Sequence, residues 1–306
     1  MVIAQPRPRA TQSLIITVTD PLDPRIASFR HVRDRDIAGR GEDGGFIAEG
    51  EVVLAVLARS PLYRAEALLI AASRLDRLAG LIGAFPSRTP VYSAAQAVMD
   101  AIVGFPIHRG VLAFGRRGGR ASATEVLARA PPRAIVMALL GVSNHDNIGG
   151  VFRNAAAFGV HAVLLDAACC DPLYRKAIRV SVGASLIVPF ARLPRGADAL
   201  DLLERHGFCC LALSPSGGAV LAHLAHPDRV AVLLGAEGSG LPAAILARAQ
   251  TVAIPMNGAF DSLNVATASG IVLHHLAFGT AAGGAGGPPP SSGGATGLSS
   301  RAAAAL

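Results

Sequence analysis

Short apolar runs alternate with amphipathic segments along most of the 306-residue chain. In the first 120 residues this pattern predicts, in order, helix 45–60, strand 65–73, helix 74–85, strand 89–94, helix 94–104 and strand 110–115. Elements that alternate in this way pack in layers, because each one buries an apolar face against its neighbours. The first part of the chain is therefore expected to be a small α/β sandwich.

The alternation starts again at Arg133. It predicts strands 134–142, 161–166, 186–190, 208–213, 230–235 and 251–255, with helices 148–159, 172–184, 197–207 and 241–249 between them and a closing helix from Ser262. These strands are short and apolar on both faces, as the strands of a parallel sheet covered by helices on both sides are. The fold class is thus α/β, with a second domain built on a parallel sheet.

Composition divides the chain further. We expect a first domain over 1–120, a Gly- and Arg-rich linker over 121–132, a second domain over 133–280 and a tail over 281–306. The tail consists mostly of Gly, Ala, Pro and Ser, whose side chains bury too little apolar surface to offset the entropy of ordering. It is expected to be disordered.

The bulk composition narrows the function classes. Hydrophobic residues make up 51% of the chain, yet no uncharged apolar run approaches the roughly 18 residues that a membrane span needs. The first residues lack the apolar core of a signal peptide, so a cytoplasmic protein without membrane association is expected. The cysteines lie in two adjacent pairs, Cys169-Cys170 and Cys209-Cys210, a spacing that fits reduced, buried thiols better than a zinc or redox site. No metal is expected.

The formal charge of +7 comes almost wholly from arginine, since Lys176 is the only lysine. Residues 1–129 carry 17 Arg against 12 Asp and Glu (net +5), whereas residues 130–306 carry 11 basic and 9 acidic residues (net +2). Arginine binds phosphate well, which favours a polyanionic partner, although a compositional bias of the genome is an alternative explanation. Two clusters stand out: Arg25, Arg30, Arg33, Arg35 and Arg40, which are interleaved with Asp34 and Asp36, and Arg109, Arg116, Arg117 and Arg120.

Three glycine-bearing polar loops follow three of the predicted strands, at 143–159, 233–242 and 254–264. Open α/β sheets bind their ligands at the carboxyl ends of the strands, so these loops are expected to line one site. A dinucleotide-binding oxidoreductase is disfavoured, because Glu237 among the glycines of the second loop would repel a pyrophosphate. A cationic or amine-bearing ligand suits that loop better.

Each polar residue in these loops also has a simpler explanation. Asn147, Ser262 and Asn264 are typical helix caps, an ordinary ion pair would explain Glu237, and packing of its stem along apolar surface would explain Arg153. All five nevertheless fall in loops that one sheet would bring together. This coincidence favours a shared site.

The same loops carry a family resemblance. The stretches NIGGVFRNAAAFG (147–159), LLGAEGSGL (233–241) and IPMNGAFDSLNVATASGIVL (254–273) resemble, in order, the three motifs of the SpoU/TrmH family of RNA ribose 2′-O-methyltransferases in the SPOUT superfamily. The resemblance covers essentially all of 133–278. Residues 46–57 and 108–115 are similar to the small, ribosomal-protein-like RNA-binding domain that many members carry in front.

The resemblance implies a deep trefoil knot, which general folding rules would not suggest. It also implies S-adenosyl-L-methionine as methyl donor, rRNA or tRNA as substrate, and a homodimer whose active site uses both subunits. The catalytic set it implies is Asn147, Arg153, Glu237, Ser262 and Asn264, and the donor-binding set is Gly235, Ile254, Met256 and Leu263. At position 235 a Cβ is expected to obstruct the approach of the donor's adenosine.

In the implied reaction a ribose 2′-oxygen attacks the sulfonium methyl group, which requires positioning and proton removal. Arg153 matches the family's catalytic arginine, but a guanidinium stays protonated at working pH, so a role in clamping an RNA phosphate is an alternative. The segment before Asn147 departs from the family in carrying His145 and Asp146. A non-catalytic RNA-binding or assembly factor with the same fold is the rival hypothesis.

Overall fold

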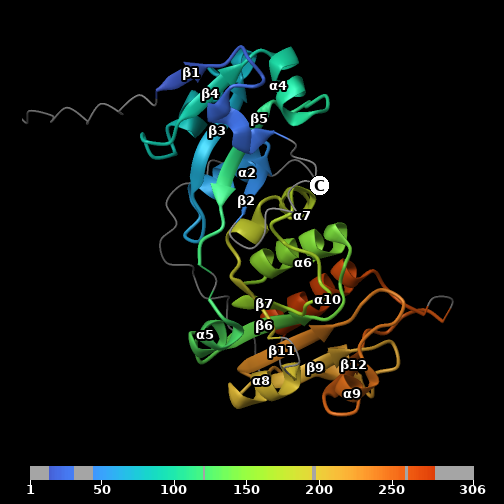
Figure 1. Cartoon of the computed structure of the whole chain (residues 1–306). Helices are drawn as coiled ribbons and strands as arrows, with labels where there is room; N and C mark the ends of the chain where they lie inside the picture. Colours follow the sequence, from blue (N-terminus) through green and yellow to red (C-terminus); the bar gives the residue numbers. More distant parts are fainter. Residues whose placement is uncertain (1–13, 31–43, 120, 195–197, 259–260, 280–306) are drawn as a thin grey trace, which may run out of the picture.

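The computed structural model describes residues 14–30, 44–119, 121–194, 198–258 and 261–279. Two β-sheets dominate it, one in the first part of the chain and one in the second, with helices between and around them (Figure 1). The predicted tail and the first 13 residues lie outside the described residues, as do Arg33, Arg35, Arg40 and Arg120.

The first sheet has five strands in the order β1-β4-β3-β5-β2. β1, β4 and β3 run parallel, whereas β5 is antiparallel to both β3 and β2. The elements of this part are β1 (Ile15–Thr17), 3₁₀ helix η1 (Pro24–Phe29), β2 (Gly45–Glu49), α2 (Glu51–Ala58), β3 (Ala65–Ala71), η2 (Ala72–Arg74), α3 (Ala79–Ile82), β4 (Val91–Ala94), α4 (Gln96–Val103) and β5 (Val111–Arg116).

The second sheet has seven strands in the order β10-β12-β9-β11-β6-β7-β8, and all of its pairings are parallel. Its strands are β6 (Ala134–Leu139), β7 (Ala162–Leu165), β8 (Phe190–Arg192), β9 (Cys209–Leu213), β10 (Ala219–Val220), β11 (Arg229–Leu234) and β12 (Gln250–Ala253). Its helices are α5 (Ala123–Ala128), α6 (His145–Ala157), α7 (Arg175–Val180), η3 (Ala184–Leu186), α8 (Ala199–Arg205), η4 (Leu221–His223), α9 (Ala243–Leu246) and α10 (Val265–Phe278).

Successive residues of the central strands bury opposite faces of this sheet. In β6, Val136 and Ala138 pack in one apolar core with α5 and α8, whereas Met137 and Leu139 pack in another with α6, α7 and α10. Side chains alternate across a strand, so strands that are apolar at every position need cover on both faces. The predicted parallel-sheet architecture is confirmed.

The two sheets are joined by one continuous core. Phe46, Leu57 and Leu68 from the first part belong to the same cluster of buried residues as Ile178 and Leu186 from the second. α7 packs against β2, and α2 packs against η3. The two parts therefore meet over apolar surface rather than through an extended connection.

Two buried ion pairs reinforce this junction. Arg175 on α7 donates through Nη1 to Oε2 of Glu49 on β2 at 2.9 Å, and its guanidinium lies 4.8 Å from the centre of the Phe105 ring. Arg117, just after β5, donates to Asp171 in the second part. Each of these two guanidinium groups is therefore paired with a carboxylate of the same chain.

The helix predicted over 45–60 is wrong in its first third. Residues Gly45–Glu49 form strand β2, all five are buried, and α2 begins only at Glu51. Gly50 between them has φ +99°, a conformation that ends the strand and that other residues rarely adopt. A short apolar run such as 45–49 fits a buried strand and a buried helix equally well, which explains the error.

The linker predicted over 121–132 contains helix α5 instead of irregular chain alone. Ser122 and Glu125 form a reciprocal capping box at its start, and Val126 and Leu127 are buried under the second sheet. The sequence contains the Ser-x-x-Glu pattern of a helix start here, but the surrounding glycines and prolines favoured a linker.

Several boundaries also differ from the prediction. α6 begins at His145 with Asn144 as its cap, so Asn147 lies inside the first turn and does not cap the helix. The last helix begins at Val265 with Asn264 as its cap, three residues after the predicted start. The strand predicted over 186–190 lies later, at Phe190–Arg192.

Candidate active site

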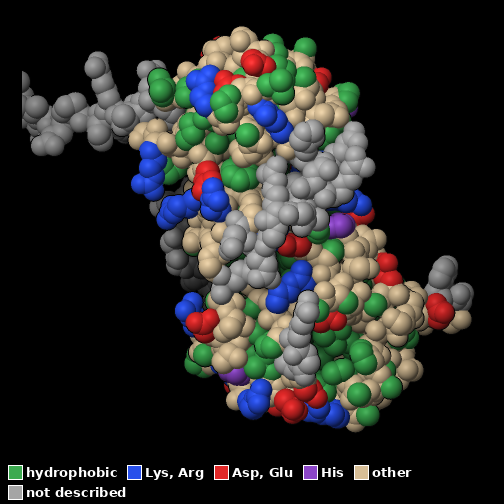
Figure 2. Space-filling view, viewed as in Figure 1, with side chains coloured by type: hydrophobic (Ala, Val, Ile, Leu, Met, Phe, Trp, Pro, Cys, Tyr) green, Lys and Arg blue, Asp and Glu red, His purple; other side chains and the backbone are tan. Residues whose placement is uncertain are grey.

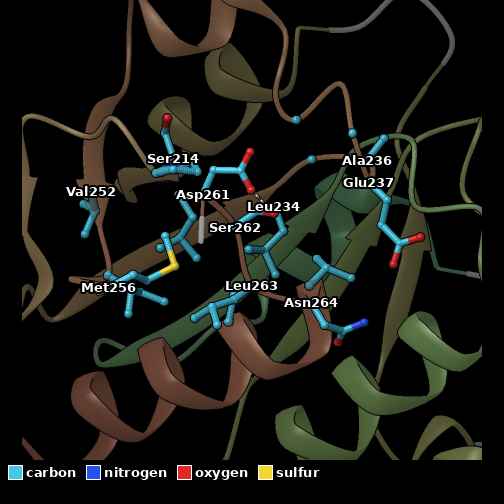
Figure 3. A pocket seen from close by; sticks show the side chains of 18 residues that line it. Ser214, Leu234, Ala236, Glu237, Val252, Met256, Asp261, Ser262, Leu263 and Asn264 are labelled. Atoms are coloured by element: carbon cyan, nitrogen blue, oxygen red, sulfur yellow. Dashed lines mark hydrogen bonds between the residues drawn. The ribbon is translucent and has the colours of Figure 1, made fainter. Parts of the chain in front are cut away.

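A pocket of about 590 Å³ opens at the carboxyl ends of β9, β11 and β12. Four of the residues expected to bind the donor line it: Gly235, Ile254, Met256 and Leu263. Three of the residues expected to be catalytic, Glu237, Ser262 and Asn264, also line it (Figure 3). Of the three loops predicted to converge on one site, the second and the third line this pocket.

The second loop folds tightly upon itself. A Cβ on Gly235 would lie 2.1 Å from the carbonyl carbon of Gly240 and 2.3 Å from the amide nitrogen of Leu241, and Ala236 pairs with Gly240 in an isolated β-bridge. Gly238 and Gly240 have positive φ values of 82° and 65°. The glycine at 235 is therefore required by the loop's own backbone, in addition to any ligand that approaches it.

Three side chains from three loops form a hydrogen-bonded chain beside the pocket, which we call the amide relay: Asn264, Asn147 and Glu237. Asn264 Oδ1 accepts from the backbone amides of Ala266 and Thr267 at 2.9 and 3.2 Å, as a helix cap does. Its Nδ2 donates to Asn147 Oδ1 at 2.8 Å, and Asn147 Nδ2 donates to Glu237 Oε1. The relay connects the first loop to the other two.

Asn147 itself does not line the pocket. Its side chain is only 3% exposed and lies behind Glu237 and Asn264. Burial of an amide is costly unless its donors and acceptor are paired, and here one hydrogen bond satisfies the oxygen and another the nitrogen. Asn147 thus orients the two residues in front of it.

The charged side chains on the described pocket wall are both carboxylates. Glu237 and Asp261 lie on it, and no Lys or Arg is among the described lining residues. Ser262 donates through Oγ to Asp261 Oδ1 at 3.3 Å, which is the dashed contact in Figure 3. A pocket with this charge favours a cationic ligand, as the sulfonium donor is, over an anionic one. Its volume also falls in the usual range for small-molecule sites.

Arg153 lies outside the pocket. It projects from α6 into solvent and makes no hydrogen bond or ion pair with any residue that the structure describes. The next residue, Asn154, faces the other way and donates to Ala266 O at 2.7 Å and Ser269 Oγ at 2.9 Å on α10. A Cβ on Gly150 would lie 2.6 Å from that of Ala266, so α6 and α10 approach closely, while Arg153 on α6 remains exposed. The structure of one chain does not bring Arg153 to the other four residues.

The departure at His145 and Asp146 leaves the start of α6 intact. Asn144 Oδ1 accepts from the backbone amide of Asp146 at 2.8 Å, and the Asp146 carboxylate accepts from Lys176 at 2.7 Å. The ring of His145 packs edge-on against Tyr174. These contacts give the unusual residues a structural role next to the first loop.

The prediction missed one wall of the pocket. Ser214 and Pro215, which follow β9, also line it. The stretch Ser-Pro-Ser-Gly-Gly at the end of a parallel strand was the available signal, because such residues mark turns and this edge of the sheet binds ligands.

The described arginines of the two predicted clusters are mostly engaged inside the chain. Arg25 pairs with Asp23, Arg116 with Glu66 and Arg117 with Asp171. At the lower edge of the face shown in Figure 2, over α8, basic and acidic side chains lie next to one another, because Arg248 pairs with Asp198 and Asp201.

The cysteines are free thiols within the domain core and its margin. Burial raises the pKa of the Cys169 and Cys210 thiols to about 12, which keeps them protonated and unreactive at neutral pH. Among the described residues, no three His, Cys, Asp or Glu side chains are placed to hold a metal ion. No helix in the described ranges is long and apolar enough to span a membrane.

Comparisons with known proteins agree with this geometry. The sequence pattern of the SpoU rRNA Methylase family matches residues 134–274. An uncharacterised tRNA/rRNA methyltransferase of Mycobacterium bovis is 40% identical over 282 residues, which are 86% of this chain and 94% of that protein. The 23S rRNA (guanosine-2′-O-)-methyltransferase RlmB of Salmonella typhi is 29% identical over 72% of this chain and 93% of its own.

A solved structure shares the fold. The AdoMet-bound rRNA methyltransferase from Sinorhizobium meliloti superimposes with a TM-score of 0.68 over 86% of this chain and 97% of its own, at 22% identity. The sequence matches and the shared fold identify the chain as a member of a class of RNA methyltransferases, as the three motifs implied. More narrowly, the chain belongs to the SpoU rRNA methylase family.

Proposed function

We propose that the protein transfers the methyl group of S-adenosylmethionine to a ribose 2′-hydroxyl of rRNA or tRNA in the cytoplasm. The observation that carries this proposal is the pocket wall itself, where Gly235, Ile254, Met256 and Leu263 lie beside Glu237, Ser262 and Asn264. The names of the relatives support the substrate class.

When bound, the donor supplies an electrophilic methyl group on a sulfonium. The tight loop at 235–240 would hold its nucleoside through backbone groups, and the apolar side chains of Ile254, Met256 and Leu263 would cover it. Glu237 and Asp261 would favour its positive charge. Asn147 would fix Glu237 and Asn264 through the amide relay.

We further propose that the protein is a homodimer in which Arg153 acts on the pocket of the other subunit. Arg153 is exposed on α6, away from the pocket of its own chain. Beside it, α10 exposes Ile271 (39%) and Phe278 (60%), and Phe278 lies edge-on to Phe158 at 6.2 Å. An exposed apolar strip along two neighbouring helices is the kind of surface that pairs with a second copy. Arg153 would then clamp an RNA phosphate beside the reacting ribose.

We also propose that the chain has two domains. The first binds RNA, and the second is catalytic and contains a trefoil knot. The family assignment supports the knot. The two sheets and their separate helical layers support the division.

The decisive experiment compares the wild type with Arg153→Ala. Calorimetry with S-adenosylmethionine should show binding to both proteins, because Arg153 lies outside the pocket of its own chain. Labelled methyl transfer to unmodified rRNA and tRNA transcripts should occur with the wild type and fall by about 100-fold or more with the variant, as for a lost charge clamp in a transition state. Donor binding without transfer to any transcript would favour the rival, a non-catalytic assembly factor.

Mixing tests the subunit assignment. Arg153→Ala and Asn264→Ala chains, each impaired alone, should form mixed dimers that regain about a quarter to a half of the wild-type rate, because one of the two pockets is then intact. No recovery on mixing would contradict the shared site.

A further inference from the structure

A second cavity, of about 290 Å³, lies where the first part of the chain meets the second, and we call it the junction cavity. Leu62 and Tyr63 reach it from the first part, and Pro189 and Phe190 reach it from the start of β8. The segment that follows β5 and the helix α5 line it between them. Residues from both parts of the chain therefore form this cavity together.

The junction cavity and the candidate active site lie at opposite edges of the second sheet. His161 and Pro189, which line the junction cavity, come immediately before β7 and β8, at the amino ends of these strands. The active-site pocket lies at the carboxyl ends of β9, β11 and β12, and all the pairings in this sheet are parallel. The two cavities share no described lining residue, so a ligand in the junction cavity is distinct from the methyl donor.

Basic side chains line the junction cavity, and no Asp or Glu is among its described lining residues. The charge of Arg117 is matched by Asp171. Arg129, the C-cap of α5, is exposed and forms no ion pair with a residue that the structure describes. Glu125 is near enough to interact with it electrostatically, but the Glu125 carboxylate accepts hydrogen bonds from Ser122 in the capping box. Arg129 thus leaves a positive charge at this cavity.

Several N–H groups at the junction cavity have no acceptor. Arg117 donates through Nη1 to Asp171, but its Nε is buried and has no hydrogen-bond partner. A buried donor without a partner is rare and is often explained by a bound water or ion. The backbone amides of Gly118 and Gly119 make no hydrogen bond with any described residue, and a Cβ on either glycine would meet nothing within 4 Å. These groups can donate to the oxygen atoms of a ligand.

The rest of the lining is mostly apolar and is held in place by the core. Tyr63 packs edge-on against Phe46, with ring centres 5.4 Å apart, and Phe190 packs against Phe152 at 5.7 Å. Leu62 is 41% exposed and adds further apolar surface. The volume of the cavity is at the lower end of the range for small-molecule sites. A ligand that fits has an anionic group and a less polar part of modest size.

We propose that the junction cavity binds a nucleotide through its phosphate group. The guanidinium of Arg129 and the amides of Gly118 and Gly119 hold the phosphate oxygens, because guanidinium and backbone N–H groups both bind phosphate well. The sugar and base lie against the apolar side of the cavity. Free nucleotides and RNA both carry this chemistry, and only the RNA case rests on the proposed function.

The test measures the binding of uridine and guanosine 5′-monophosphates by calorimetry. S-adenosylmethionine is present at a saturating concentration, so that it occupies the active-site pocket. We expect at least one nucleotide to bind the wild type, and the matching nucleoside, which lacks the phosphate, to bind at least about 10-fold more weakly. Circular dichroism of each variant below checks that it is folded.

Arg129 offers the sharpest variants, because it is exposed and its replacement leaves the core intact. Arg129→Gln should weaken nucleotide binding by about 10-fold, since a hydrogen bond to a charged group is lost. Arg129→Glu places a carboxylate at the cavity and should abolish binding. Arg205→Gln is the matched control, because Arg205 is an exposed arginine in the last turn of another helix, α8, and does not line the cavity. It should bind as the wild type does.

Arg117→Lys tests the buried donor. Lysine keeps the positive charge that pairs with Asp171 but has no group equivalent to Nε. Nucleotide binding should weaken by about threefold or more, because one donor is lost.

A short RNA of mixed sequence distinguishes the two sources of the phosphate group. If RNA is the ligand, this RNA should bind more tightly than either mononucleotide and should lose affinity in Arg129→Gln by about the same factor. If a free nucleotide is the ligand, the RNA should bind no more tightly than the mononucleotides. Each result supports a phosphate site in the junction cavity.

Three results would overturn the proposal. Equal binding of nucleotide and nucleoside would show that no phosphate is recognised. Unchanged binding in both Arg129→Gln and Arg129→Glu would place the nucleotide elsewhere on the protein. Binding of neither mononucleotide nor the RNA would show that the cavity takes another ligand or none. None of these measurements depends on methyl transfer, so a failure of the proposed function is recognised separately, by the absence of methylation.

Discussion

Charged residues have different roles at the junction between the two parts of the chain and at the pocket. At the junction, Glu49 pairs with Arg175 and Asp171 with Arg117, and the four side chains are between 6% and 20% exposed. At the pocket, Glu237 and Asp261 are exposed and face no cation on the described wall. Charges that are paired and buried hold the chain together, whereas charges left open are available to a ligand. The sequence shows all of them alike, as isolated Arg, Asp and Glu.

The largest expected effect on stability is at the junction. Arg175→Met should lower the free energy of unfolding by about 3 kcal/mol, because the Glu49 carboxylate, 8% exposed, loses its partner. Urea denaturation followed by circular dichroism measures this loss. Donor affinity should not change, since neither residue lines the pocket.

A double variant sharpens the interpretation. Glu49→Gln combined with Arg175→Met removes both charges and should recover part of the lost stability, because a buried pair replaced by neutral groups is often close to neutral. If Arg175→Met alone lowers the free energy of unfolding by less than about 1 kcal/mol, the pair contributes no more than a surface ion pair does. The charges at the junction would then not differ from those at the pocket in their effect on stability.

The next effect is at the pocket. Gly235→Ala forces a methyl group into the backbone at Gly240 and Leu241, with contacts of 2.1 to 2.3 Å, and should cost about 1 to 3 kcal/mol locally. If that strain is concentrated in the donor-binding loop, donor affinity falls by about 10- to 100-fold. Calorimetry measures it. Gly80→Ala, where an added Cβ would meet nothing within 4 Å, is the control and should bind the donor normally.

The smallest effect concerns an exposed arginine of the first domain. Arg116 donates to Glu66 at 2.7 Å, but the two side chains are 62% and 42% exposed, so Arg116→Ala should change stability by less than about 1 kcal/mol. Its charge is already matched by Glu66, and filter binding to an RNA transcript should show less than about a threefold loss of affinity. A larger loss of RNA affinity would mean that the ion pair opens and that Arg116 binds phosphate. Arg116 would then be available to a ligand, as Glu237 and Asp261 are.

The main features of the second domain could be predicted from its sequence, because strands apolar on both faces and separated by helices have few other arrangements. The first domain was harder. Residues 45–49 form a strand whose pattern equally fits a helix, and only the backbone at Gly50, with φ +99°, decides between them. Ser122 and Glu125 carry the sequence pattern of a capping box, but the Gly and Pro residues around them favoured a linker over a helix.

The sequence predicted several residues that line the pocket, but not how the side chains around it are arranged. Motif spacing correctly brought Glu237 and Asn264 to one edge of the sheet. It did not distinguish Asn147, which is buried behind them, from Arg153, which points away on the outer face of the same helix. Which face of a helix meets the core depends on its packing partner, here α10, and that partner lies more than 100 residues further along the chain.

The residues of the amide relay are far apart in the sequence, and this determines when their hydrogen bonds can form during translation. Asn147 is 90 residues from Glu237 and 117 from Asn264, and both hydrogen bonds must form before Glu237 is held. A chain still emerging from the ribosome contains the first loop, and then the second, well before it contains Asn264. Contacts this distant in sequence form late. Newly made chains should therefore remain inert toward RNA until the final helix has been translated and docked.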